Sequence, residues 1–346
     1  MPAAVVNHSV VLRVRPRGAP QPSDFAVVES PLRDLEAGEV LVQNLFVSLD
    51  AGFRKWMDEG SGDHILPAMQ LGAPVMGLTL GRVVESKRAD FPVGTHLMAR
   101  LAWQEYSITD ATDFLVVVPD EYDCPLSWHL GILGDTGMSA YFGLQDIGRP
   151  APGETVVISA AGGAVGSIAG QIARIAGART VGIASGAAKC AQLVDRLGYD
   201  VAVDRTCADV VGALRDACPD GVDVYLDSVS GPLLEVVLEQ INVGARIALC
   251  GAVATYNALT PLPGPGNLFK LVTNQARMEG YMTHLLHDRY PQARRQLLDW
   301  VEGGQLVSVE YMLHGIDRVG DAFCDLFAGR NFGKTVVELC ATSVPS

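Results

Sequence analysis

Several features that mark common protein classes are missing from this sequence. Its 346 residues contain no run of about 18 apolar residues, the kind of segment that crosses a membrane. Positive charge is also scarce, because 26 Lys and Arg face 39 Asp and Glu, giving a formal net charge of −13. Proteins that bind nucleic acid usually need a basic patch to neutralise phosphate. We therefore expect neither a membrane nor nucleic acid as a partner.

Paired cysteines are missing as well. No two of the seven cysteines form a CxxC motif, which argues against a zinc knuckle and against a disulfide framework. The first 18 residues lack a continuous apolar core behind a basic end, so we expect no targeting segment. Reduced thiols in a cytoplasmic protein are the simplest interpretation.

The sequence does contain two kinds of secondary-structure pattern. Up to about residue 120, short strand-like runs alternate with turn residues, as in an all-β domain. From Leu126 a helical segment through Trp128–Leu144 is expected, and then strands and helices alternate, which predicts a parallel sheet. A tail of strand, helix and strand after residue 306 is expected to return to the first domain. The fold class is therefore α/β, with a β-rich domain and a doubly wound parallel-sheet domain.

One stretch, at 154–184, organises the second half. It reads as a strand, a turn of Ala and Gly, a helix from Ala164 and a second strand. Small residues at Ala161, Gly163 and Gly166 occupy the three positions of a GxGxxG fingerprint, with Ala in place of the first glycine. The N-terminus of the following helix, including Ala164 and Val165, would present N–H groups to a pyrophosphate. A purely structural turn is an equally simple reading of these residues alone.

The end of the second strand indicates which dinucleotide binds. A carboxylate at this place binds the ribose diol and repels a 2′-phosphate. The sequence instead has Ser185 and Lys189 there, and Arg205 follows the third strand. Each cation alone could be an ordinary solvated charge, but together they favour NADPH. Asp204 lies nearby and either opposes a phosphate or caps a helix expected to begin at Cys207.

The chain also carries a series of short motifs in a fixed order. It resembles the medium-chain dehydrogenase/reductase superfamily, and most closely its zinc-free branch of NADPH-dependent alkenal double-bond reductases. The motifs span most of the sequence: NLFVSLDAGFR at 44–54, GRVVES at 81–86, WQEY at 103–106, GDTGMSAYFGL at 134–144, AAGGAVG at 160–166, LDSVSG at 226–231, CGAVATYN at 250–257 and GRNFGK at 329–334. Their order and spacing make the resemblance specific.

The resemblance implies an architecture and an activity. A β-rich, GroES-like catalytic domain would comprise residues 1–127 and be completed by 312–346, and a Rossmann domain would comprise 128–311. The implied reaction is reduction of the double bond of an α,β-unsaturated ketone or aldehyde: hydride adds at the β-carbon and the enolate is protonated, without a metal. Family members are commonly dimers, so we expect a homodimer that takes a small-molecule substrate.

The resemblance also assigns residues. Tyr256 maps onto the family's active-site Tyr and would contact the substrate oxygen, although a Tyr that only closes a loop is the alternative reading. The remaining expected cofactor contacts would line the nicotinamide half or the turn beside it: Thr136, Ser228, Cys250, Gly251 and Asn331. For Cys250 a buried strand-end thiol is the competing interpretation.

The sequence departs from the family pattern at the substrate side. The segment 50–54 has Gly52 and Phe53 where the family carries an aromatic hydroxyl, so the pocket is expected to be wider or chemically altered. Arg54 would hold an acidic substrate tail or form an ion pair. Phe269, at the end of the proline-rich segment 260–270, would face substrate or a neighbouring subunit, and the segment itself is either a lid or a spacer.

Zinc ligands are missing from the places where zinc-dependent relatives carry them. Those places hold Ser48, Gly77 and Leu78, and the four-cysteine lobe is also absent. Two other functions fit the same pattern: an NADPH-dependent quinone oxidoreductase, which would not need Tyr256, and a catalytically silent NADPH-binding relative.

Overall fold

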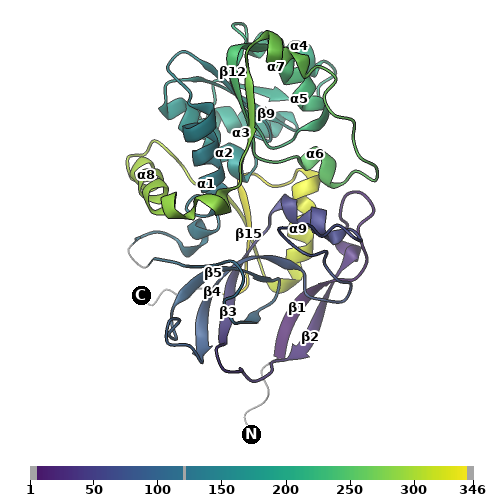
Figure 1. Cartoon of the computed structure of the whole chain (residues 1–346), viewed down its shortest axis with the longest axis vertical. Helices are drawn as coiled ribbons and strands as arrows, with labels where there is room; N and C mark the ends of the chain where they lie inside the picture. The colour runs from purple at the N-terminus through teal and green to yellow at the C-terminus, as the bar shows by residue number, and fades with distance from the viewer. Residues whose placement is uncertain (1–5, 120–121, 341–346) are drawn as a thin grey trace. The chain divides into compact units, whose positions relative to one another are not determined.

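A computed structural model of the chain describes residues 6–119 and 122–340. The chain divides into two compact units. Unit 1 contains residues 1–130, 311–330 and 335–346, and unit 2 contains residues 131–310 and 331–334. Each unit has its own sheet (Figure 1). The domain boundaries expected from the sequence remain a prediction about which segments act together.

Unit 1 is built on antiparallel pairing. Its larger sheet has the strand order β14-β15-β3-β4-β5-β7, with β6 paired to β3, and β1 and β2 form a separate hairpin. The strands are β1 (Val6–Leu12), β2 (Phe25–Pro31), β3 (Val40–Ser48), β4 (Met76–Ser86), β5 (His96–Ala102), β6 (Tyr106–Thr109), β7 (Leu115–Val117), β14 (Glu310–His314) and β15 (Lys334–Glu338). The helical elements are η1 (Pro22–Asp24), η2 (Ala51–Met57), η3 (Leu126–His129), η6 (Ile316–Arg318) and α9 (Val319–Ala328).

Aromatic packing fills the core of unit 1. Trp103 and Phe323 are almost fully buried, and their rings meet edge to face with 5.2 Å between centroids. Phe25 of β2 packs against both rings. Because α9 supplies Phe323, part of the C-terminal tail lies in the core of unit 1.

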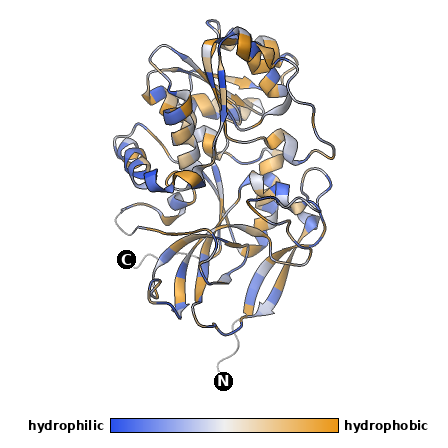
Figure 2. Cartoon of the chain, in the orientation of Figure 1, coloured by the Kyte–Doolittle hydropathy of each residue, from blue (hydrophilic) through white to orange (hydrophobic). Residues whose placement is uncertain are grey.

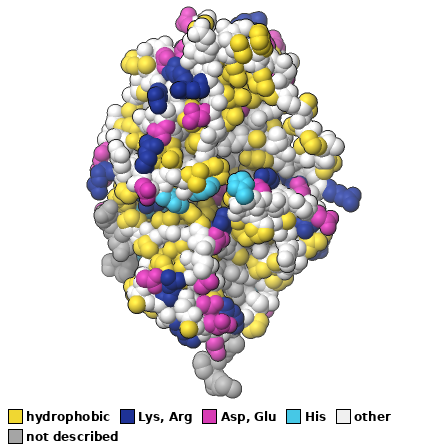
Figure 3. Space-filling view, in the orientation of Figure 1, with side chains coloured by type: hydrophobic (Ala, Val, Ile, Leu, Met, Phe, Trp, Pro, Cys, Tyr) yellow, Lys and Arg dark blue, Asp and Glu magenta, His cyan; other side chains and the backbone are white. Residues whose placement is uncertain are grey.

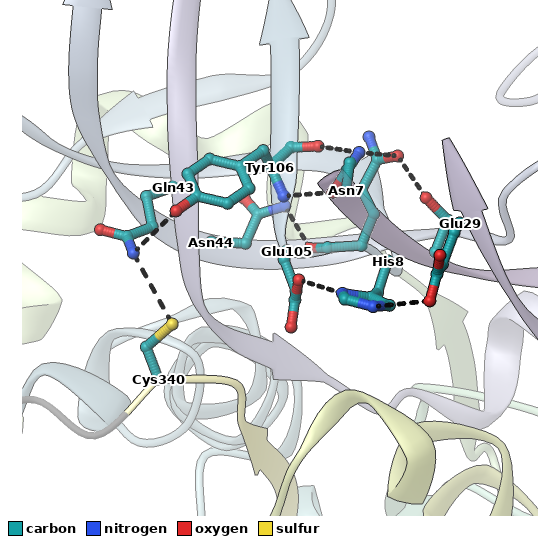
Figure 4. A network of polar contacts seen from close by, with 10 residues as sticks. Asn7, His8, Glu29, Gln43, Asn44, Glu105, Tyr106 and Cys340 are labelled. Carbon is teal, nitrogen blue, oxygen red and sulfur yellow. Dashed lines mark hydrogen bonds and ion pairs between the residues drawn. The ribbon is translucent and has the colours of Figure 1, made fainter. Parts of the chain in front are cut away.

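A polar network joins the β1–β2 hairpin to β6 on one side of unit 1 (Figure 4). Asn7 donates to the carbonyl of Tyr106 at 3.0 Å and accepts from its N–H at 2.9 Å. His8 lies between two carboxylates, with Nδ1 2.7 Å from Glu105 and Nε2 3.5 Å from Glu29. The hairpin is therefore held to the main sheet by side chains as well as by apolar contacts.

Unit 2 contains a six-stranded parallel sheet in the order β10-β9-β8-β11-β12-β13. Numbered within the unit, this order is 3-2-1-4-5-6, the doubly wound arrangement of dinucleotide-binding folds. The strands are β8 (Thr155–Ile158), β9 (Arg179–Ala184), β10 (Val201–Asp204), β11 (Val222–Asp227), β12 (Ile241–Leu249) and β13 (Arg277–Gly280). The sheet order reverses between β8 and β11, and ligands bind beyond the carboxyl ends of the strands at such a point.

Helices cover both faces of this sheet (Figure 1). The helical elements of unit 2 are α1 (Asp135–Phe142), η4 (Gly143–Gly148), α2 (Ala164–Ile175), α3 (Ala187–Leu197), α4 (Val210–Ala217), α5 (Gly231–Leu238), α6 (Val253–Tyr256), α7 (Phe269–Thr273), η5 (Thr283–Arg289) and α8 (Tyr290–Glu302). Residues of α4, α5 and α7 share one apolar cluster with the strands. Figure 2 shows the matching hydrophobic colouring along the sheet and α2.

Two local expectations were wrong. The helix expected through Trp128–Leu144 is broken into η3, a turn and α1, because Gly134 is extended at the N-cap of α1 and Gly137 packs on the turn. A Cβ on Gly137 would lie 1.7 Å from the carbonyl oxygen of Ile132. The helix expected to begin at Cys207 begins at Val210 instead, and Asp209 caps it by accepting from the N–H of Gly212 at 2.8 Å.

Candidate cofactor and active site

The glycine turn lies between β8 and α2, at the point where the sheet order reverses. Ala161 is fully buried, and its N–H donates to the carbonyl of Ile183 at 3.0 Å. Gly166 has no room for a side chain, since a Cβ would lie 2.5 Å from the carbonyl oxygen of Ala160. Close packing of the helix on the strand is the role of the third glycine in this fingerprint.

The start of α2 is open to a ligand. Gly163 is its N-cap, with no side-chain hydrogen bond, and Gly163, Ala164 and Val165 are partly exposed. The N-terminus of a 12-residue helix therefore presents backbone N–H groups and positive dipole at the switch point. This geometry suits the pyrophosphate of a dinucleotide.

A buried carboxylate, Asp227, organises the neighbouring turn after β11, and it was not among the site residues predicted from the sequence. Asp227 Oδ1 accepts from the hydroxyls of Ser159 and Tyr225 and from the N–H groups of Val229 and Ser230, at 2.9–3.0 Å. Ser159 in turn accepts from the N–H of Ser228 at 2.8 Å. The network ties the ends of β8 and β11 together across the switch point. The LDSVSG motif was its only signal in the sequence.

Backbone strain marks the same two turns. Ala160 and Ser230 adopt left-handed backbone conformations with φ of 47° and 62°. Residues other than glycine seldom do so, and such outliers concentrate at functional sites. The two turns that flank the switch point are therefore held in unusual conformations by the surrounding network.

Three predicted cofactor residues meet at the carboxyl end of β9. Arg205 Nε donates to the hydroxyl of Ser185 at 2.7 Å. Burial lowers the pKa of Lys189 first, and the positive charge of Arg205 lowers it further. Within residues 6–119 and 122–340, no carboxylate forms an ion pair with either cation. Two neighbouring cations without a carboxylate partner make a site suited to a phosphate dianion.

Asp204 is bound to the loops around this site. Its Oδ1 accepts from the N–H of Gly186 at 2.8 Å and from the N–H and hydroxyl of Thr206 at 2.9 and 2.7 Å. These hydrogen bonds, with Thr206 first, lower the pKa of the carboxyl group, and the positive charge of Arg205 lowers it further. Asp204 therefore holds the loops that carry the cations and keeps its own negative charge.

Four of the expected residues lie near the ends of β11 and β12: Ser228, Cys250, Gly251 and Tyr256. The N–H groups of Cys250 and Gly251 both donate to the carbonyl of Asp227, at 2.8 and 3.1 Å. The Ser228 hydroxyl is buried without a hydrogen-bond partner among the described residues, and burial raises the pKa of the Cys250 thiol. Tyr256, in α6, accepts from the N–H of Ala252 at 3.1 Å. Thr136 lies buried in the first turn of α1.

Asn331 belongs to a short segment that packs on the glycine turn. The N–H of Gly333 donates to the carbonyl of Gly162 at 2.9 Å. A Cβ on Gly162 would lie 3.2 Å from the ring of Phe332, so this ring covers the turn. Asn331 is buried and donates to the carbonyl of Gly333 at 3.3 Å. Phe332 and Gly162 were not predicted as site residues, although GRNFGK was noted as a motif.

The expected substrate residues are distributed over both units. Phe53 is packed in the core of unit 1, with its ring 5.8 Å from that of Trp56. The buried Arg54 pairs with Asp58 at 2.8 Å and donates to the carbonyls of Pro16 and Gly18 at 3.1 Å. These contacts favour the ion-pair reading of Arg54 over a role in holding a substrate.

Gly52 and Phe269 have little around them within their own units. A Cβ on Gly52 would meet no atom within 4 Å. Phe269, in unit 2, is 71% exposed, so it does not line a cavity of that unit. The sequence could not show this exposure, because an aromatic residue at a helix start is compatible with either face.

The donor groups fit NADPH. The glycine turn has little room for Cβ atoms where a backbone must approach a ligand, and the two cations lie at the end of β9, where a dinucleotide-binding fold receives the adenosine ribose. Over the described part of the chain, no group of three or more His, Cys, Asp or Glu side chains could hold a metal ion. None of the described helices has both the length and the apolar character needed to cross a membrane.

Comparisons with known proteins identify the family of the chain. Residues 8–117 match a family model described as the N-terminal domain of oxidoreductase, and residues 164–302 match one described as zinc-binding dehydrogenase. The chain is 37% identical to the NADPH-dependent curcumin reductase of Escherichia coli K12, covering 96% of this chain and 97% of that protein. It is 36% identical to the NADP(+)-dependent 2-alkenal reductase of Nicotiana tabacum, covering 97% and 98%.

A solved structure shows the same architecture. The crystal structure of CurA from Vibrio vulnificus in complex with NADPH matches with a TM-score of 0.89 and 34% sequence identity, covering 96% of this chain and 99% of that one. The expected fold class, a GroES-like domain with a Rossmann domain, is confirmed.

Proposed function

Because the chain belongs to the medium-chain dehydrogenase/reductase superfamily, in its branch of NADPH-dependent alkenal double-bond reductases, we propose that it reduces the carbon–carbon double bond of α,β-unsaturated ketones or aldehydes. The family resemblance expected from the motifs is confirmed by these relatives. The chain is an NADPH-dependent oxidoreductase.

The pair of cations at the end of β9 is the observation that carries the choice of cofactor. Lys189 and Arg205 form no ion pair with a carboxylate among the described residues, and Arg205 is oriented by Ser185. We assign these three residues to the 2′-phosphate. We assign the pyrophosphate to the turn Ala161–Gly166, whose third glycine leaves no room for a Cβ.

The reaction then needs little acid–base machinery. Bound NADPH supplies the hydride. The carbonyl group of an enone withdraws electrons from its β-carbon, so addition there converts the substrate into an enolate, which needs a stabilised oxygen and a proton at its α-carbon. We assign Tyr256 to the oxygen, because a phenol can accept one hydrogen bond, as from Ala252, while donating another.

A substrate panel tests this assignment. Alkenals, aryl enones and quinones are each offered with NADPH and, separately, with NADH, and both cofactor oxidation and the product are measured. Saturated ketones or aldehydes formed with NADPH support the proposal. Turnover of quinones alone would replace it by a quinone oxidoreductase. Thermal stabilisation by NADPH without turnover of any compound would replace it by a silent cofactor-binding relative.

Unit 2 exposes apolar side chains beside an edge strand. Strand β13 is mostly exposed, and so are the side chains of Val243, Phe269 and Val272, at 71%, 71% and 64%. Figure 3 shows hydrophobic side chains at the surface in this region of unit 2. We propose that a second copy of the chain covers them in a homodimer. Val272→Glu should then lower the mass measured by light scattering to that of one chain.

A cytoplasmic location is proposed for the same protein. All seven cysteines are free thiols, which supports a reducing compartment. Cell fractionation followed by immunodetection tests this expectation, and recovery in a membrane or extracellular fraction would contradict it.

A further inference from the structure

Tyr281 lies beside Cys250 at the carboxyl edge of the parallel sheet of unit 2. Leu249, the last residue of β12, is paired with Gly280, the last residue of β13. Cys250 and Tyr281 are the next residues on each strand, so they leave the sheet as neighbours. Ligands of doubly wound sheets bind at this edge.

The phenol of Tyr281 makes a short hydrogen bond to α1. Its hydroxyl donates to the carbonyl oxygen of Ser139 at 2.6 Å. A Cβ on Gly143 would lie 2.4 Å from the Tyr281 oxygen, so a glycine at this position makes room for the hydroxyl. Burial raises the pKa of Tyr281 well above its usual value, and the phenol therefore stays a neutral donor.

The thiol of Cys250 lies beside this phenol. Burial is the largest cause that raises the pKa of the thiol, and the nearby Tyr281 side chain acts in the opposite direction. Backbone N–H groups hold Cys250 to Asp227, as described above. The hydrogen bond from Tyr281 to Ser139 therefore fastens the end of β13, next to Cys250, to α1.

The position of this network relative to the cofactor follows from the sheet. The cations assigned to the 2′-phosphate stand at the end of β9, on one side of the switch point. A dinucleotide whose pyrophosphate lies at the glycine turn then extends its other half over the ends of β11 and β12. Cys250 stands at the end of β12, where the nicotinamide ring would rest.

We propose that Tyr281 is a positioning residue, which holds Cys250 and α1 as a rigid wall against the nicotinamide ring. The inference rests on the proposed function and adds a residue to it. Tyr281 itself touches neither the cofactor nor the substrate in this scheme. It fixes the surface that sets the angle and distance for hydride transfer, to which reaction rates are highly sensitive.

The first test needs cofactor binding but no turnover. The partly exposed Cys250 is alkylated with iodoacetamide, and its modification rate is followed by mass spectrometry with no ligand, with 2′-phospho-ADP-ribose and with NADP⁺. Both ligands fill the adenosine half, and only NADP⁺ carries the ring. Cys124 of unit 1 serves as the reference thiol. If Cys250 is alkylated more slowly with NADP⁺ than with 2′-phospho-ADP-ribose, the nicotinamide ring covers Cys250, as proposed. Equal rates with the two ligands overturn this contact.

The second test is Tyr281→Phe, which removes one oxygen and keeps the ring. We expect kcat for the best enone to fall roughly tenfold, with the Kd for NADPH changed by less than about twofold. Tyr311→Phe is the matched control, because Tyr311 of unit 1 also donates one partly buried hydrogen bond, to Asp325 at 3.0 Å. An unchanged kcat, or a loss of kcat matched by equal loss of NADPH binding or by unfolding, overturns the positioning role.

A second variant changes the space that holds the Tyr281 hydroxyl. Gly143→Ala places a methyl group against this hydroxyl and should lower kcat without weakening NADPH binding. An unchanged kcat in a folded variant overturns the inference. If the wild-type protein reduces no enone, the proposed function fails. The alkylation comparison still decides whether the ring rests on Cys250, since it requires only bound NADP⁺.

Discussion

The strongest prediction concerns cofactor choice, and it is tested by removing the charge of Lys189. In Lys189→Met the ammonium group is lost, whereas the aliphatic stem that lies near the glycine turn is kept. We expect the Kd for NADPH to rise while the Kd for NADH stays the same, because only NADPH carries the 2′-phosphate.

The magnitude follows from the surroundings of each cation. A hydrogen bond to a charged group is worth about 1.5–3 kcal/mol, which corresponds to roughly 10- to 150-fold in Kd. Lys189 is half-buried, so we expect its loss to fall in the upper part of this range. Arg205 is exposed and screened by solvent, so Arg205→Gln should fall near the lower end. In the double variant the Kd for NADPH should rise by less than the product of the two single-variant factors, since both cations would contact one phosphate.

Two measurements check this reasoning. Fluorescence titration gives the Kd for NADPH and NADH with wild type, both variants and Arg215→Ala, an exposed cation of α4 that serves as control. In addition, NADPH affinity should decrease as pH rises through the lowered pKa of Lys189, since the free amine no longer attracts the phosphate. An equal loss of NADPH and NADH binding in Lys189→Met would refute the assignment.

Three further predictions concern the rest of the molecule. Tyr256→Phe should lower kcat for enones about 100-fold, the scale of one lost oxyanion donor, with little change in NADPH Kd; unchanged steady-state turnover excludes the role. Gly166→Ala should destabilise unit 2 by about 1–3 kcal/mol and weaken NADPH binding, because its Cβ would press on the Ala160 carbonyl; a melting temperature equal to wild type contradicts this. Hydrogen bonding to Glu105 raises the pKa of His8, so its stabilising contribution is present below pH 6.5 and is lost as pH rises through the raised value. The difference in melting temperature between wild type and His8→Gln should therefore shrink from pH 6 to pH 8, and a constant difference would contradict the ion pair.

The parallel sheet and the cofactor turn could be read from the sequence because their signals are local. Strands and helices that alternate at short spacing dictate a doubly wound sheet, and a turn of Ala and Gly before a helix dictates a close backbone approach. The cofactor preference is a local signal as well, because the residues that follow the second strand, beginning at Ser185, include no carboxylate. Motif order then identified the family, although it could not identify the substrate.

The tertiary structure decided the roles that depend on long-range contacts. Arg54 is bound to residues about 40 positions earlier, so only the fold could show that its donors serve unit 1. Asp204 turned out to hold the loop beside Gly186, and Phe332 covers a glycine 170 positions earlier in the sequence. Tyr281 gave no signal at all, because its partner Ser139 is separated from it by 142 residues. The sequence determines which polar groups the chain possesses. The tertiary structure determines which of these groups form hydrogen bonds within the protein and which remain available to a ligand.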